Sequence, residues 1–97
     1  MDGFWIGVNV VTVEVTVINR LGMHARAAAR FVREASTYDS EIWVYKGKAR
    51  VNGKSIMGIL TLAAAMGDRI MIEAQGSDAD EAIRALTDLV NTGFGEN

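Results

Sequence analysis

The sequence predicts an α+β fold, an open-faced β-sandwich in which three helices cover one face of a four-stranded, mainly antiparallel sheet. Short segments with a hydrophobic period of two alternate with segments of helical spacing, in the order β-α-β-β-α-β-α. Two of the strands follow each other closely, which indicates a hairpin and favours helices packed on one side of the sheet. With 97 residues, 49% of them hydrophobic, the chain can build one core and not two. We expect an N-terminal extension over residues 1–9 and a single domain over residues 10–97.

The first strand is predicted from Val11 to Val17, where four valines occupy alternate positions. A loop over residues 19–23 follows. The first helix is predicted from Ala25 to about Tyr38, because small and apolar residues recur there at helical spacing while the arginines fall on the opposite face.

A β-hairpin is predicted next, with strands at Glu41–Lys46 and Lys48–Val51 joined at Gly47. Ser55–Leu62 has the pattern of a short helix. Ser55 is well placed as its N-cap, because a serine hydroxyl can accept a hydrogen bond from a free backbone N–H of the first turn.

The last strand and the last helix complete the fold. A turn at residues 67–68 leads into a period-two strand over residues 70–75. The last helix is predicted to begin at Ser77 or Asp78, where acidic residues three positions on suit a capping box, and to end at Gly93. Its predicted buried face consists of Ala82, Ile83, Leu86, Leu89 and Val90.

Composition excludes several classes of function. The net charge of −2 gives no bulk electrostatic reason to bind nucleic acid. With no cysteine and one histidine, a thiolate or histidine-rich metal site is excluded, and we expect neither metal nor cofactor. No apolar run approaches the roughly 18 residues of a membrane span, and no signal peptide is evident. We therefore expect a cytoplasmic monomer without membrane insertion.

His24 is the candidate for chemistry, because it directly precedes the first predicted helix. The free N–H groups and partial positive charge of a helix N-terminus favour a phosphate, and they favour a neutral, nucleophilic imidazole. Arg26 adds a permanent cation with a planar donor fork, and Gly22 permits a tight turn. A lone histidine before a helix is more often a surface residue, so these features make phosphoryl chemistry possible without establishing it.

The segment Leu21-Gly22-Met23-His24-Ala25-Arg26, followed by an alanine-rich helix, resembles the active-site motif of the HPr family of the bacterial phosphoenolpyruvate-dependent phosphotransferase system. The resemblance continues through residues 39–44, 51–60 and 76–83 to the ending at residues 93–96. Several motifs in the right order cover nearly all of the predicted domain, which is thereby identified as an HPr-like phosphocarrier domain.

The resemblance implies that His24 accepts a phosphoryl group from Enzyme I, itself charged by phosphoenolpyruvate, and passes it to the IIA component of a sugar permease. Such a chain is a substrate of phosphotransfer enzymes and not an enzyme. The resemblance implies Nδ1 as the acceptor, a choice that the sequence chemistry leaves open. It also implies that Arg26 screens the phosphoryl charge and that Glu96 engages Arg26 when phosphate is absent. Ala27 stands where the family usually has proline, which puts the rigidity of His24 and the transfer rate in question.

Ser55 has a second reading beside its role as an N-cap. The resemblance implies phosphorylation of this serine by an ATP-dependent HPr kinase/phosphorylase, which would add negative charge to the face that meets partner proteins. We expect Enzyme I and IIA to share one docking surface on the first and second helices, formed by Met23, Ala25, Arg26, Ala29, Arg33, Ile56, Met57 and Leu60.

Two alternatives stay open. One is a regulatory paralogue of the nitrogen branch, which the motif at residues 22–26 and the ending at residues 91–94 also fit, whereas the block at residues 54–58 favours the sugar branch. The other is an RNA- or ligand-binding α+β module, because Trp43 and Tyr45 share one face of the second strand. The net charge and the lack of a glycine–aromatic RNA signature count against that module.

Overall fold

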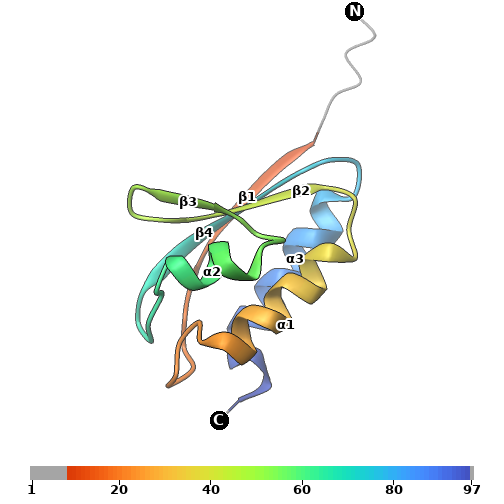
Figure 1. The fold of residues 1–97 in the computed structure, drawn as a ribbon. Helices are drawn as coiled ribbons and strands as arrows, with labels where there is room; N and C mark the ends of the chain where they lie inside the picture. Colours follow the sequence, from red (N-terminus) through yellow and green to blue (C-terminus); the bar gives the residue numbers. More distant parts are fainter. Residues whose placement is uncertain (1–8, 97) are drawn as a thin grey trace, which may run out of the picture.

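The structure is a computed structural model and describes residues 9–96 (Figure 1). It confirms the predicted order of elements and the open-faced sandwich. None of the helices within residues 9–96 is long and apolar enough to cross a membrane. The elements are β1 (Val10–Thr16), α1 (Ala25–Ser36), β2 (Glu41–Lys46), β3 (Ala49–Asn52), α2 (Ile56–Thr61), β4 (Arg69–Gln75), α3 (Ala79–Asn91) and a short 3-10 turn, η1 (Gly93–Gly95).

The sheet has the strand order β1-β4-β2-β3, and each pair of neighbours is antiparallel. Pairing of Val15 with Ile70, and of Val44 with Ile72, aligns the apolar positions of three strands on one face. The three helices cover that face, as Figure 1 shows, and the opposite face is left open. The largest fully buried side chains lie in this single core: Val17, Phe31, Ile42, Val44, Ile59, Ile70, Ile72, Leu86, Val90 and Phe94.

The topology brings two distant parts of the chain to one end of the molecule. Thr16, at the end of β1, pairs with Arg69 at the start of β4, so α1 begins at this end. β4 finishes at the opposite end, where Gln75 pairs with Val10, and α3 runs back from there. The start of α1 and the C-terminal segment therefore lie at the same end (Figure 1).

The element boundaries differ slightly from those predicted. The first helix ends at Ser36 and not near Tyr38, and β3 is shifted by one residue to Ala49–Asn52. Leu89 is only partly buried on α3. Residues 1–8 of the expected N-terminal extension lie outside the described residues.

The capping box predicted for the last helix is wrong. Asp78 is the N-cap of α3, but its side chain caps no N–H of that helix. Its carboxylate instead accepts hydrogen bonds from the Asp39 N–H at 2.8 Å, the Ser40 N–H at 3.0 Å and the Ser40 hydroxyl. The Ser40 hydroxyl and the Asp39 N–H lower the pKa of Asp78. The N–H groups between α1 and β2 thus donate to the Asp78 carboxylate, which is then not available to cap α3. These bonds tie the start of α3 to the start of β2.

The aromatic pair on the open face of the sheet is engaged by neighbouring side chains. The Arg50 guanidinium lies 3.6 Å from the centroid of the Trp43 ring. The Tyr45 hydroxyl accepts a hydrogen bond from Arg50 Nε at 3.1 Å and donates to Glu73 at 2.6 Å. Because Arg50 covers Trp43, this face lacks the open aromatic platform on which the RNA-binding alternative depends.

Ala63 follows the C-cap of α2 with a φ of 50°, a left-handed conformation that costs an alanine roughly 1–2 kcal/mol. Lys46 Nζ donates to the Leu62 carbonyl at 3.3 Å and to the Ala63 carbonyl at 3.2 Å. Ala63→Gly should relieve the strain, and the gain should exceed the extra entropy of glycine in the unfolded chain. We expect the variant to raise the free energy of unfolding by about 0.5–1 kcal/mol, as measured by urea denaturation.

Ala65→Gly provides the matched control, since Ala65 is also exposed but has no positive φ. This control should lose stability, because glycine there gains nothing from the left-handed region. A loss of stability in Ala63→Gly equal to that of the control would contradict the assignment of strain to Ala63.

Candidate functional site

The loop before α1 is built around a glycine that no other residue can replace without distortion. Gly22 has a φ of +64°, and a Cβ placed on it would lie 2.6 Å from the Ala64 carbonyl oxygen. Its N–H donates to the Asn19 carbonyl at 3.1 Å, which closes the turn. The next N–H, that of Met23, donates to the Ala64 carbonyl at 2.8 Å. The loop is therefore fixed to the segment that follows α2.

His24 is the N-cap of α1, as predicted. Its backbone is extended, with φ −76° and ψ 180°, and its carbonyl accepts the Ala28 N–H at 2.8 Å. The imidazole makes no capping hydrogen bond, and 25% of the side chain is exposed. The helix thus fixes the backbone of His24 and leaves its ring available for other contacts.

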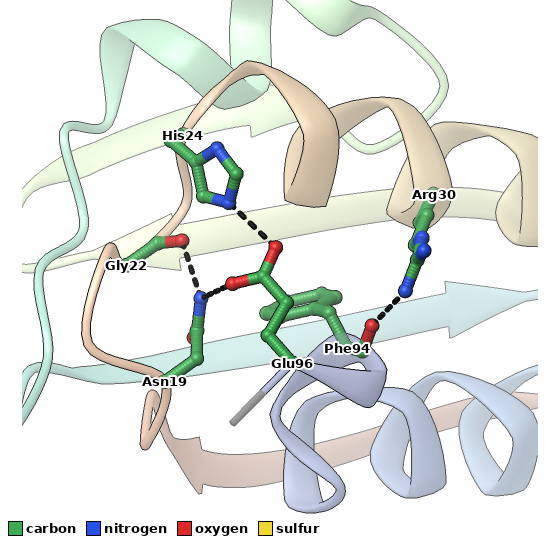
Figure 2. A network of polar contacts seen from close by, with 6 residues as sticks. All are labelled: Asn19, Gly22, His24, Arg30, Phe94 and Glu96. Atoms are coloured by element: carbon green, nitrogen blue, oxygen red, sulfur yellow. Dashed lines mark hydrogen bonds and ion pairs between the residues drawn. The ribbon is translucent and has the colours of Figure 1, made fainter.

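A polar network joins this ring to the C-terminal segment (Figure 2). His24 Nε2 lies 2.6 Å from Glu96 Oε2. Asn19 Nδ2 donates to Glu96 Oε1 at 2.9 Å and to the Gly22 carbonyl at 2.8 Å. The other ring nitrogen, Nδ1, faces away from Glu96 in Figure 2. The hydrogen bonds of the Glu96 carboxylate go to His24 and Asn19 and not to Arg26, so the expected partnership with Arg26 is limited to the attraction of its charge.

The Glu96 carboxylate is ionised at neutral pH. Its pKa is lowered chiefly by the hydrogen bond from Asn19, next by that of His24, and to a smaller extent by the positive charge of Arg26. A carboxylate in this state can only accept a hydrogen bond. The proton in the short contact therefore belongs to Nε2 of His24, which leaves Nδ1 with a lone pair in the neutral ring.

Phe94 anchors the segment that carries Glu96. Its ring is fully buried, although its φ of 58° is in the left-handed region. Its carbonyl accepts a hydrogen bond from the Arg30 guanidinium of α1 (Figure 2). The buried ring and the arginine hold the 3-10 turn against α1, so that Glu96 arrives beside His24. Sequence reasoning missed Asn19 and the role of Phe94, because both act through contacts between residues far apart in the chain.

A hollow of about 290 Å³ opens beside the network. Three guanidinium groups line it with only one carboxylate, which makes it attractive to a phosphoryl group. Arg26, proposed from the sequence as a phosphate partner, is exposed here. The lining residues are Arg20, Leu21, Arg26, Arg30, Gly95 and Glu96.

Most of the residues predicted to form a docking surface are accessible, with one exception. The prediction that Met23 belongs to the docking surface is wrong, because this residue is only 3% exposed. The hydrogen bond from its backbone to Ala64 turns its side chain into the core. Leu21, which the prediction omitted, is 69% exposed. The other predicted positions are exposed at Ala25, Arg26, Arg33, Ile56 and Met57 and partly buried at Ala29 and Leu60.

Ser55 lies away from the loop of His24. As predicted, it is the N-cap of α2, and its hydroxyl accepts the Gly58 N–H at 3.0 Å. The His24 loop contacts the chain beyond the other end of this helix, at Ala64. The two candidate modification sites are therefore joined through α2 and are not one cluster.

An α+β domain that presents a histidine at a helix N-terminus beside a basic hollow is the kind of structure expected of a phosphoryl carrier. The chain matches the family model described as "PTS HPr component phosphorylation site" over residues 11–92. It therefore belongs to the HPr family of phosphocarrier proteins of the phosphotransferase system.

Individual relatives agree with this assignment. The chain is 56% identical to the phosphocarrier protein HPr of Neisseria meningitidis serogroup A over 82 residues, which are 84% of this chain and 92% of that protein. It is 40% identical to the phosphocarrier protein NPr of Shewanella violacea over 83 residues, or 86% and 91% of the two chains. The crystal structure of HPr-C-His from Thermoanaerobacter tengcongensis superposes with a TM-score of 0.87 at 46% identity, covering 90% of this chain and 98% of that one.

The lowered pKa of Glu96 predicts a pH dependence of stability. Its contribution is present above the ordinary value of 4.5 and is lost as the pH falls through the lower folded-state pKa. The wild type should therefore lose more stability than Glu96→Gln on acidification below about pH 4.5. Denaturant unfolding at a series of pH values measures this, with Glu14→Gln on the exposed sheet as the control. Parallel stability curves for wild type and Glu96→Gln would contradict the prediction.

Proposed function

We propose that His24 is the residue that carries the phosphoryl group and that Nδ1 is the accepting atom. The observation that carries the proposal is the 2.6 Å contact between Nε2 and the ionised Glu96 carboxylate. This contact places the ring proton on Nε2, so the lone pair of the neutral imidazole is on Nδ1. That atom faces away from Glu96 (Figure 2) and belongs to the residue that caps α1.

In the transfer, the Nδ1 lone pair attacks phosphorus and forms an N–P bond. The bond from phosphorus to the donor breaks, and its electron pair leaves with the donor atom. Onward transfer reverses these steps toward the next acceptor. The chain is in this view a carrier and the substrate of phosphotransfer proteins, charged by Enzyme I and discharged by the IIA component of a sugar permease.

Arg26 supports this chemistry through charge. Its guanidinium lines the basic hollow with Arg20 and Arg30, and it follows His24 by two residues on α1. A phosphoryl group carries negative charge on its outer oxygens, and a planar guanidinium can donate two parallel hydrogen bonds to such oxygens. We assign Arg26 to stabilising that charge while the group moves.

A surface on α1 and α2 supports docking of both partners. Ile56 and Met57 on α2 are 43% and 70% exposed, and α2 packs against α1, where Arg26 and Arg33 are exposed. Apolar side chains beside arginines suit an acidic partner that is bound briefly. Enzyme I and IIA would use this one surface and would therefore exclude each other.

We favour the sugar branch over the nitrogen branch because of the block Lys54-Ser55-Ile56-Met57-Gly58 around the N-cap of α2. Phosphorylation of Ser55 by an HPr kinase/phosphorylase stays a prediction, as does a cytoplasmic location. The Ser55 hydroxyl is partly exposed and keeps its own proton when it accepts the Gly58 N–H. This geometry is compatible with modification.

Replacement of His24 tests the proposal directly. Wild type and His24→Ala are incubated with phosphoenolpyruvate and Enzyme I, and their intact masses are recorded. The wild type should gain one acid-labile phosphoryl group and the variant none, because alanine has no nucleophile. Peptide mapping of the wild type should place the group on His24. Acid-labile phosphate on the His24→Ala variant would contradict the proposal.

Arg26→Gln tests the role of the guanidinium. Glutamine is shorter and uncharged but still polar, so phosphorylation by Enzyme I should slow by about tenfold, the effect of one charge-assisted hydrogen bond. The acceptor should remain His24. Arg84→Gln, an exposed arginine on α3, is the matched control and should react like the wild type. Equal rates for all three proteins would exclude the proposed role.

A further inference from the structure

We propose that Glu96, held in place by Asn19, is a positioning residue that keeps a proton on Nε2 of His24 both before and after phosphorylation. The inference rests on the proposed role of His24 as the carrier residue. It assigns one carboxylate to two tasks: selecting the nucleophilic nitrogen, and keeping the phosphorylated ring able to give its phosphoryl group away.

Asn19 is built to orient the carboxylate. Its side chain is only 4% exposed, and Nδ2 uses one hydrogen for the Gly22 carbonyl and the other for Glu96. The amide cannot be turned over, because both partners are acceptors. Its Oδ1 is buried without a hydrogen-bond partner among the described residues, which is a costly arrangement. The amide is therefore placed for its two donors.

Before phosphorylation, the contact fixes the tautomer of the ring. The ionised carboxylate can accept a proton from Nε2 and cannot donate one. Any ring with its proton on Nδ1 would place two lone pairs against each other across 2.6 Å. The carboxylate therefore suppresses the tautomer that cannot attack phosphorus, in the way that a carboxylate orients a catalytic histidine elsewhere.

After phosphorylation, the same contact governs release. When the N–P bond forms, Nδ1 has given its lone pair, and a ring that keeps its Nε2 proton is a cation. A neighbouring carboxylate stabilises that cation. In onward transfer the N–P bond breaks and its electron pair returns to Nδ1, so the ring leaves as neutral imidazole. Without the Nε2 proton it would have to leave as an anion, a far poorer leaving group.

The surroundings make the carboxylate the decisive charge. The hollow next to it is lined by Arg20 from the loop and by Arg26 and Arg30 from α1. These cations stabilise the phosphoryl oxygens but disfavour the positive charge on the ring. The loop after α2 contributes backbone at Ala64 on the other side. Among the charged groups described here, Glu96 is the one that favours the ring cation.

Glu96→Gln tests the inference in protein labelled with 15N in the histidine ring. Long-range 15N–1H spectra report the tautomer without any phosphorylation, and the variant should show more of the Nδ1–H form. Transfer to IIA near neutral pH should slow by about tenfold.

Three further variants separate charge from structure. Glu96→Asp keeps the charge and should recover part of both effects, whereas Asn19→Leu keeps the carboxylate but frees it, and should shift the tautomer partway. Glu14→Gln, on the exposed strand β1, should behave as the wild type. Thermal melts establish that each variant is folded.

The outcomes are distinguishable from those of the proposed function. If the wild type is phosphorylated on His24 but Glu96→Gln has an unchanged tautomer and transfer rate, the role of Glu96 is refuted and the carrier residue stands. If Glu96→Asp is no better than Glu96→Gln, the effect is one of packing and the inference also fails. If the wild type takes no phosphate on His24, the proposed function fails, whatever the tautomer measurement shows.

Discussion

The antiparallel pairing of β1 with β4 is the constraint on which the rest of the molecule depends. It sets Thr16 opposite Arg69 and Val10 opposite Gln75, so the first and last strands end at opposite ends of the sheet. Helix α3 must then return along the sheet to the end where α1 begins. The side-chain carboxylate of Glu96 thereby lies next to His24, which is 72 residues earlier in the chain. With β4 at another place in the sheet, neither Asn19 nor His24 would meet Glu96.

The backbone on both sides of the site is unusual, and in each case a tertiary contact holds it. Gly22 has a positive φ and also lies so close to the Ala64 carbonyl that no side chain would fit. Phe94 takes a positive φ although it is not glycine, with its ring fully buried and its carbonyl bound by Arg30. Glycine takes this conformation without strain, whereas the strain at Phe94 persists only because the surrounding structure over-determines it. The contacts of Gly22 and Phe94 hold the two segments that carry His24 and Glu96.

Local patterns in the sequence were enough to predict the fold. The alternating valines of β1, the apolar alternation through Ile70 and Ile72, and the hydroxyl of Ser55 at a helix start each depend on near neighbours, and all three predictions are confirmed. The errors have a different origin. The partners of Asp78, Asp39 and Ser40, lie 39 and 38 positions away from it in the chain. The partners of Glu96, His24 and Asn19, lie 72 and 77 positions away. Such partners are brought together by the topology of the fold, and no spacing pattern in the sequence predicts them.

The alanine at position 27 changes less than the family resemblance implies. A proline in the first turn would stiffen the backbone after His24 by fixing its φ. In this chain the residues before His24 are already fixed, by the left-handed turn at Gly22 and by the hydrogen bond from Met23 to Ala64. Ala27 itself is fully buried within α1. The ring is held from a second side by Glu96. The orientation of His24 is therefore set from two sides, by the loop before it and by Glu96, and neither set of contacts depends on a proline at position 27.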